Sequence, residues 1–162
     1  THWSSANDDE HTPDDEYQLG DVDPRVTAIL SLAPSASIAW MHAVTLRHIK
    51  DRRANANDAE FVLRHLSPTV VSPEIVCTES RDPRRLRFVK FVPEANRHVH
   101  VSLKLVESSV LGAVEYKLWV SSAYPLGLRS LTRLLKRENF HVVSEEAIAE
   151  GGKSRTARRT QQ

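Results

Sequence analysis

Several side chains near the predicted strand ends could move protons or hold a phosphate group. Histidine, lysine, arginine, serine and tyrosine recur there, which is the residue inventory of RNA cleavage without a metal ion. In that reaction a base deprotonates the ribose 2′-hydroxyl, an acid protonates the leaving oxygen, and fixed cations hold the charge on the phosphorane. Histidine can take either proton role near neutral pH, and lysine or arginine can take the cation role. The residue types therefore predict chemistry on a phosphodiester.

Other kinds of catalytic or cofactor site are not predicted by any motif in the sequence. The five glycines are scattered, and none has the spacing of a phosphate-binding or dinucleotide-binding loop. The motifs Gly-x-Ser-x-Gly and His-Glu-x-x-His do not occur. The single cysteine, Cys77, excludes an internal disulfide and a cysteine-based zinc site. We therefore expect no cofactor and no metal.

Two histidines and three arginines form regular patterns that could contact nucleic acid. His98 and His100 alternate along a predicted strand, so both imidazoles point to one sheet face, without a third metal ligand near them in sequence. Arg129, Arg133 and Arg137 repeat every four residues on one side of a predicted helix. We interpret both sets as candidate nucleic-acid contacts. The alternatives are a solvated strand surface and a solvated helix face.

The elements that must position these side chains are predicted as helices first and strands afterwards. Asp23 before Pro24 predicts a helix start, and Asn57 with Glu60 predicts a second helix, which Pro68 ends. The pattern over residues 37–53 does not decide between helix and strand. Alternation and apolar spacing indicate further elements: strands at 86–92, 98–106 and 114–122, a helix at 128–137 and a short strand at 140–143.

This order of elements predicts an α+β fold, with the N-terminal helices packed on one face of a small, mainly antiparallel β-sheet. A short turn around residues 108–112 joins two of the strands and predicts a hairpin. We expect Trp40 and Trp119 to pack in the core or half-buried beside it, and not to serve as base-stacking platforms.

Charge is distributed unevenly along the chain. The first 23 residues carry eight acidic side chains and no Lys or Arg, so the remainder has 22 basic and 13 acidic side chains, a net charge of about +9. We predict an acidic disordered arm at residues 1–22, a compact domain at 23–150 and a basic disordered tail at 151–162. Since a basic body attracts polyanions, the charge favours nucleic acid as a partner.

Membrane and export segments are not predicted. No run of 18 apolar residues is present, and the N-terminus is acidic where an export signal would be basic and then apolar. We therefore expect a soluble protein with no membrane partner. A single cysteine suits a reducing compartment, so we expect the protein in the cytoplasm.

The order of several short motifs resembles the phage-associated nucleases of the Barnase-EndoU-Colicin-RelE-like superfamily. The resemblance spans about residues 36–126. It consists of a His-Ile pair, a Pro-Glu-hydrophobic turn, a basic strand, a long strand and a final strand that ends in Ser-x-Tyr. In this chain the five motifs lie within residues 46–53, 72–76, 87–90, 98–106 and 118–125.

The resemblance implies a metal-independent endoribonuclease of this type. It puts His48 in the acid/base role, Lys90 or Arg87 at the phosphate, and Ser122 with Tyr124 as hydrogen-bond partners. Such a site requires these side chains to converge on one concave basic surface. Arg53 stands where many relatives carry a second histidine, so that His42, His98 or His100 would have to supply the partner.

Three functional hypotheses follow. The first is a toxin-like or phage-borne ribonuclease, cut from the C-terminal end of a larger protein, with RNA (tRNA among the candidates) as substrate and an inhibitor or immunity protein as a second partner. The second is a non-catalytic RNA- or DNA-binding module that uses the arginine stripe of residues 129–137 and the basic tail. The third is an interaction domain whose acidic arm docks on its own basic surface.

Overall fold

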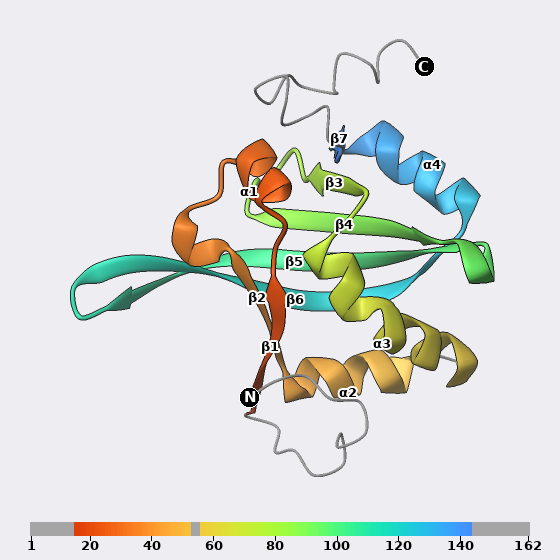
Figure 1. Cartoon of the computed structure of the whole chain (residues 1–162), viewed down its shortest axis with the longest axis horizontal. Helices are drawn as coiled ribbons and strands as arrows, with labels where there is room; N and C mark the ends of the chain where they lie inside the picture. Colours follow the sequence, from red (N-terminus) through yellow and green to blue (C-terminus); the bar gives the residue numbers. More distant parts are fainter. Residues whose placement is uncertain (1–14, 53–55, 144–162) are drawn as a thin grey trace.

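One seven-stranded sheet forms the centre of the molecule, and helices lie against it (Figure 1). The computed structural model describes residues 15–52 and 56–143. The strands are β1 (Glu16–Asp21), β2 (Ile38–His42), β3 (Ile75–Thr78), β4 (Arg85–Val92), β5 (Arg97–Val110), β6 (Ala113–Leu126) and β7 (Asn139–Val142), and the helices are α1 (Pro24–Leu30), α2 (Ala43–Arg52), α3 (Ala56–Val71) and α4 (Leu128–Arg137). The strand order is β1-β2-β6-β5-β4-β3-β7, and only the β2–β6 pair is parallel.

Helices cover the two faces of the sheet unequally. On one face, which we call the helix-covered face, α2 and α3 bury residues such as Leu46 and Leu66 against Phe88, Val101 and Leu118. On the other face α4, with Leu131 and Leu134, is the only helix among the described residues that packs. There α4 contacts residues near the β3–β7 side and the end of β6: Cys77, Val89, Leu126 and Phe140. The predicted α+β class, with the N-terminal helices on one face, is confirmed, and the described residues leave much of the second face uncovered.

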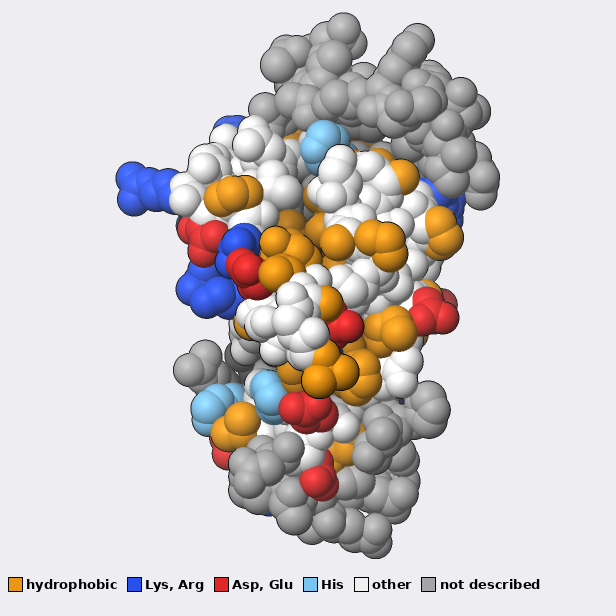
Figure 2. All heavy atoms as spheres, turned by 90° about the vertical axis from the view of Figure 1, so that its left-hand side faces the viewer, with side chains coloured by type: hydrophobic (Ala, Val, Ile, Leu, Met, Phe, Trp, Pro, Cys, Tyr) orange, Lys and Arg blue, Asp and Glu red, His pale blue; other side chains and the backbone are white. Residues whose placement is uncertain are grey.

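The hairpin of β5 and β6 extends well beyond the rest of the sheet. Each strand has fourteen residues, but β4 pairs with β5 no further than Lys104, and β2 pairs with β6 only at Leu118 and Trp119. Leu111 and Gly112 make the turn with φ angles of 52° and 82°, the left-handed pair that suits a tight hairpin. Figure 2 looks onto this end of the molecule, where hydrophobic side chains gather in the middle and Lys and Arg gather mainly along one edge. The exposed hydrophobic residues of the hairpin include Val106, Leu111 and Val114.

Most of the predicted elements are confirmed, with one clear error at a helix end. The side chain of Asp23 caps α1 by accepting a hydrogen bond from the backbone N–H of Arg25 at 2.8 Å. Pro68, however, does not end α3, which continues to Val71. A proline inside a helix removes one hydrogen bond and crowds the preceding turn, but the ring of Pro68 is exposed, and continuing the helix buries Thr69 and Val70 completely. Burial of these side chains offsets the cost of the proline.

The prediction of a disordered acidic arm was wrong for its last residues. Residues 16–21 form β1, because Tyr17 and Leu19 alternate with polar residues and are buried when β1 pairs with β2. The undecided segment 37–53 contains β2 and then α2. Residues 1–14 of the arm and the basic tail at 151–162 lie outside the described residues. No helix among the described residues is both long enough and apolar enough to cross a membrane.

Gly20 is required where β1 passes α3. Its φ is +139°, and a Cβ atom there would lie 2.8 Å from Cγ2 of Val71. We expect Gly20→Ser to lower the free energy of unfolding by about 1–3 kcal/mol, measured by urea denaturation. Gly127→Ser is the matched control, because a Cβ there meets no atom within 4 Å and serine caps helices well. Equal stability of both variants would contradict this account.

Candidate nucleic-acid interface

The uncovered part of the second sheet face, which we call the open face, carries a row of aromatic and basic side chains. Strand pairing aligns one residue from each of five neighbouring strands: Gln18, Trp40, Trp119, Lys104 and Arg85. Four interstrand spacings of about 4.8 Å give this row a length of about 19 Å. None of the five side chains is buried, and Lys104 and Arg85 are exposed. The row is therefore accessible along its length.

The two tryptophans form a compact aromatic group with a histidine and a lysine. The ring centroids of Trp40 and Trp119 are 6.3 Å apart, and His42 stacks parallel on Trp119 with a centroid distance of 4.0 Å. The Nζ atom of Lys117 lies 4.9 Å from the Trp40 ring and 5.9 Å from the Trp119 ring. Both tryptophans are half-buried, which is one of the two placements predicted from the sequence. Neither belongs to the buried core. These contacts hold the rings in place at the surface.

An irregularity in β6 turns two adjacent serines toward the open face. Val120 and Ala123 both pack in the core of the helix-covered face, although they are three positions apart. The register between β5 and β6 shifts between these positions, so that Ser121 is an extra residue. Beyond the shift, Ser122 pairs with Ser102 and Tyr124 pairs with His100. The bulge thus places hydroxyl groups next to the aromatic row.

Arg87 is the centre of a polar network where the open face meets α4. Its Nε donates to Glu138 at 2.7 Å, and Nη2 lies 3.7 Å from a carboxylate oxygen of Glu79. Its Nη1 lies 3.4 Å from Nε2 of His100. Glu138 is only 3% exposed, so this ion pair is largely shielded from water. The guanidinium of Arg87 is therefore fixed in one orientation.

His100 is neutral and cannot contact nucleic acid directly. It is fully buried, and its ring lies 4.4 Å from that of Tyr124. Burial first, and then the positive charges of Arg87 and Arg137, lower the pKa of His100 to about 3. No hydrogen-bond partner of its Nδ1 atom is found among the described residues. The prediction that His100 is a nucleic-acid contact was therefore wrong, because its side chain points inward under Tyr124 and Arg87.

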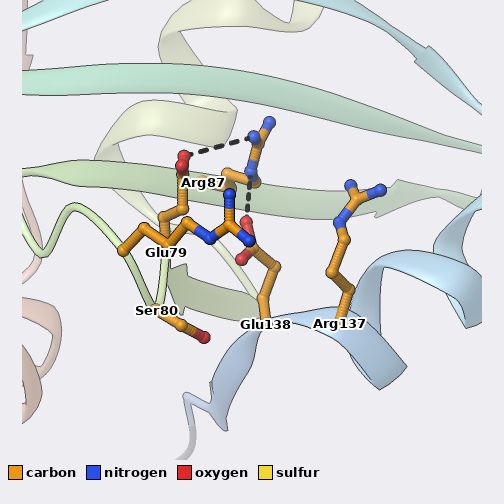
Figure 3. Close-up of a pocket in the computed structure, with 6 residues that line it drawn as sticks. Glu79, Ser80, Arg87, Arg137 and Glu138 are labelled. Carbon is orange, nitrogen blue, oxygen red and sulfur yellow. Dashed lines mark hydrogen bonds and ion pairs between the residues drawn. The ribbon is translucent and has the colours of Figure 1, made fainter.

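The remaining predicted contact residues lie near the open face or at its border. His98 is half-buried beside the ring of Phe91, and burial lowers its pKa while the charge of Glu74 opposes the shift. The three arginines of α4 are exposed, and Arg133 and Arg137 line a pocket together with Tyr124. Arg137 also lines a second pocket beside Arg87 (Figure 3).

The side chains predicted to be catalytic do not converge on one surface. Arg87, Ser122 and Tyr124 belong to the open face. Lys90 belongs to the helix-covered face, where its Nζ donates to the backbone oxygen of Ser72 at 2.9 Å. His48 is an exposed residue of α2, which packs on that same face. The sheet thus separates the expected acid/base residue and one expected phosphate ligand from the rest of the set.

Comparison with known proteins gives no relative. The chain matches no family model, no curated protein and no solved structure. Within residues 15–52 and 56–143, no group of three His, Cys, Asp or Glu side chains could hold a metal ion. The chemical properties of the site therefore follow from its own side chains.

Sequence reasoning missed Lys104 and Lys117 as members of the site, and it named His42 only as a possible acid/base partner and not as a ring stacked on Trp119. Lys104 and Lys117 could have been found, because both alternate with core residues of predicted strands and so face away from α2 and α3. His42 lies on a strand that was not predicted, and only the parallel pairing of β2 with β6 brings it to Trp119.

The lowered pKa of His100 predicts a loss of stability in acid. Between pH 6.5 and about 3 the unfolded chain holds a proton on this histidine that the folded protein lacks, so stability falls as the pH falls through this window. The slope approaches about 1.4 kcal/mol per pH unit for one proton. Urea unfolding at pH 4–7 should show this contribution in the wild type and its loss in His100→Gln. If the free energy of unfolding depends on pH in the same way in both proteins, His100 makes no such contribution.

Proposed function

We propose that this chain binds single-stranded nucleic acid, with RNA as the natural candidate, on the open face of its sheet. The observation that carries the proposal is the row from Trp40 and Trp119 to Lys104 and Arg85, with Lys117 beside the two rings. It combines two flat aromatic surfaces with two cations that follow them along the row, Lys104 and Arg85, and a third, Lys117, that lies over the rings.

The energetics of such a row suit a polynucleotide strand. Stacking of a base on an aromatic side chain contributes about 1–3 kcal/mol, and it tolerates any base because every base has a π face. Lysine and arginine neutralise phosphates and release the counterions held by the strand. The rings of Trp40 and Trp119 are already held by His42 and Lys117, so little side-chain entropy is lost when a base stacks.

The shape of the face favours single strands over duplexes. The aromatic rings are half-buried among neighbouring side chains of the sheet surface. Bases inside a duplex are stacked on each other and present only their edges in the grooves, so they cannot reach these rings. A single strand can turn its bases toward the sheet and keep its phosphates near Lys104 and Arg85.

Binding without cleavage agrees better with the placement of the polar residues than catalysis does. The predicted acid/base residue His48 and the predicted phosphate ligand Lys90 are separated from Tyr124 by the sheet. His100 is close to Tyr124, but it is buried and neutral near pH 7. The resemblance to the nuclease superfamily and the ribonuclease activity stay predictions.

Loss of the Trp119 ring should weaken binding strongly. We expect Trp119→Ala to raise the Kd for a fluorescein-labelled ten-nucleotide RNA by roughly 5- to 150-fold, since about 1–3 kcal/mol of stacking is removed. Trp119→Phe should retain most of the affinity, because it keeps an aromatic ring at this position. Fluorescence anisotropy at a fixed salt concentration measures the effect.

Two outcomes would count against the proposal. Equal affinity of Trp119→Ala and wild type would remove the aromatic row from the site. Shortening of the RNA during an incubation in EDTA, abolished by His48→Ala, would instead favour the ribonuclease prediction. A hairpin duplex of the same length should bind more weakly than the single strand, and preference for the duplex would contradict the argument from shape.

Lys104 should act through phosphate contact alone. We expect Lys104→Gln to weaken binding to every sequence about equally and to reduce the slope of log K against log salt by roughly 0.7. Arg64→Gln is the control, because Arg64 is an exposed cation on α3, against the other face of the sheet, where it pairs with Glu60. If both variants change the slope equally, the effect is one of net charge and not of this face.

A further inference from the structure

Three arginines line a pocket where the open face meets the end of α4. Its walls are Glu79, Ser80 and Arg81, which follow β3, together with Arg87 of β4 and Arg137 and Glu138 at the end of α4. Figure 3 shows Glu79 and Glu138 directed at Arg87, and Arg137 extending from α4 toward the strand that carries Arg87. The pocket therefore gathers side chains from three separate parts of the chain.

The three guanidinium groups have different roles. Arg87 is held by the carboxylates of Glu138 and Glu79, which fix its position and more than neutralise its charge. Arg81 and Arg137 are exposed, and among the described residues neither has an ion-pair partner. Two guanidinium groups are therefore available to an anion that enters the pocket, beside a third whose orientation is already fixed.

The pocket has a net positive formal charge. Arg81, Arg87 and Arg137 contribute three positive charges, and Glu79 and Glu138 contribute two negative charges, which leaves a net charge of +1. His100 lies under Arg87, with its Nε2 atom 3.4 Å from Nη1, and the positive charges of Arg87 and Arg137 both oppose protonation of this histidine. An anion that enters the pocket therefore meets a net positive charge.

The pocket also marks the end of the open face. In the row of Ser122, Ser102 and Arg87, the next residues across the sheet are Cys77 and Phe140. Both are buried in the cluster that α4 covers. A nucleic-acid strand that follows this row toward β4 therefore meets the residues covered by α4 directly beyond Arg87.

We infer that this pocket binds the terminal phosphate monoester of a single-stranded nucleic acid lying on the open face. The inference rests on the proposed function and deepens it. A phosphate monoester carries a charge of about −1.5 to −2 at pH 7 and has three terminal oxygens, whereas a phosphodiester within the strand has one charge and two. The guanidinium group of arginine offers paired N–H donors in one plane, which suit the oxygens of such a phosphate. Because this phosphate lies at the end of the nucleic-acid strand, it also fits a site at the end of the face.

The test compares three oligonucleotides of one sequence: with a 5′-phosphate, with a 3′-phosphate, and with hydroxyl groups at both ends. By fluorescence anisotropy, we expect wild type to bind one phosphorylated form about tenfold more tightly than the hydroxyl form. The form that is preferred identifies the strand end that enters the pocket. Arg81→Gln and Arg137→Gln should each remove most of this preference, and Arg81→Gln should change the Kd of the hydroxyl form less than twofold.

Arg64→Gln provides the matched control, because Arg64 is an exposed arginine of α3, on the helix-covered side of the sheet, and lines neither of the two pockets that Arg137 lines. Arg87 is not substituted, since its loss would leave the buried Glu138 carboxylate without its partner. Equal affinity for the three oligonucleotides, or a preference that survives both substitutions, would overturn the inference alone. Absence of binding to all three would overturn the proposed function and the inference with it.

Discussion

The pairing of β5 with β6 is the constraint on which the rest of the molecule depends. These two strands are the longest in the sheet, and β2 and β4 attach to their outer sides. Their register decides which side chains enter the core with Leu103 and Leu118 and which ones face away with Lys104 and Trp119. A slip of one residue would exchange the two sets, so the hydrophobic core and the open face are specified by the same pairing.

The sequence was sufficient where signals are local. The hairpin, β4 and α4 follow from alternation and helical spacing within short windows. The strands β1 and β3 are short. The strand β2 pairs with β6 in parallel through two residues on each strand, and no local sequence pattern predicts this pairing. The proposed catalytic set failed to converge for a reason that the sequence did contain. Arg87 and Lys90 are three positions apart on one predicted strand, and alternation puts such residues on opposite faces.

The ion pair of Arg87 with Glu138 links parts of the fold that local signals could not connect. Glu138 is the residue that ends α4, and its backbone N–H donates to the oxygen of Leu134. Its side chain reaches a strand 51 positions earlier in the chain. A shielded pair of this kind adds little net stability, because desolvation opposes the attraction, but it penalises arrangements in which either charge is left alone. It therefore fixes where the end of α4 lies on the sheet, and with it the position of Arg137.

The projecting hairpin carries the lysine that lies over the two tryptophan rings. Beyond Lys104 and Leu118 the two strands have only each other as sheet partners within the described residues, and an isolated two-stranded ribbon is marginally stable in water. Lys117 is the first residue of β6 on the hairpin side of this boundary, and its ammonium group lies over both tryptophan rings. The cation over the two rings is therefore carried by the part of the sheet with the fewest strand partners, while the rings themselves lie where β2 and β6 pair.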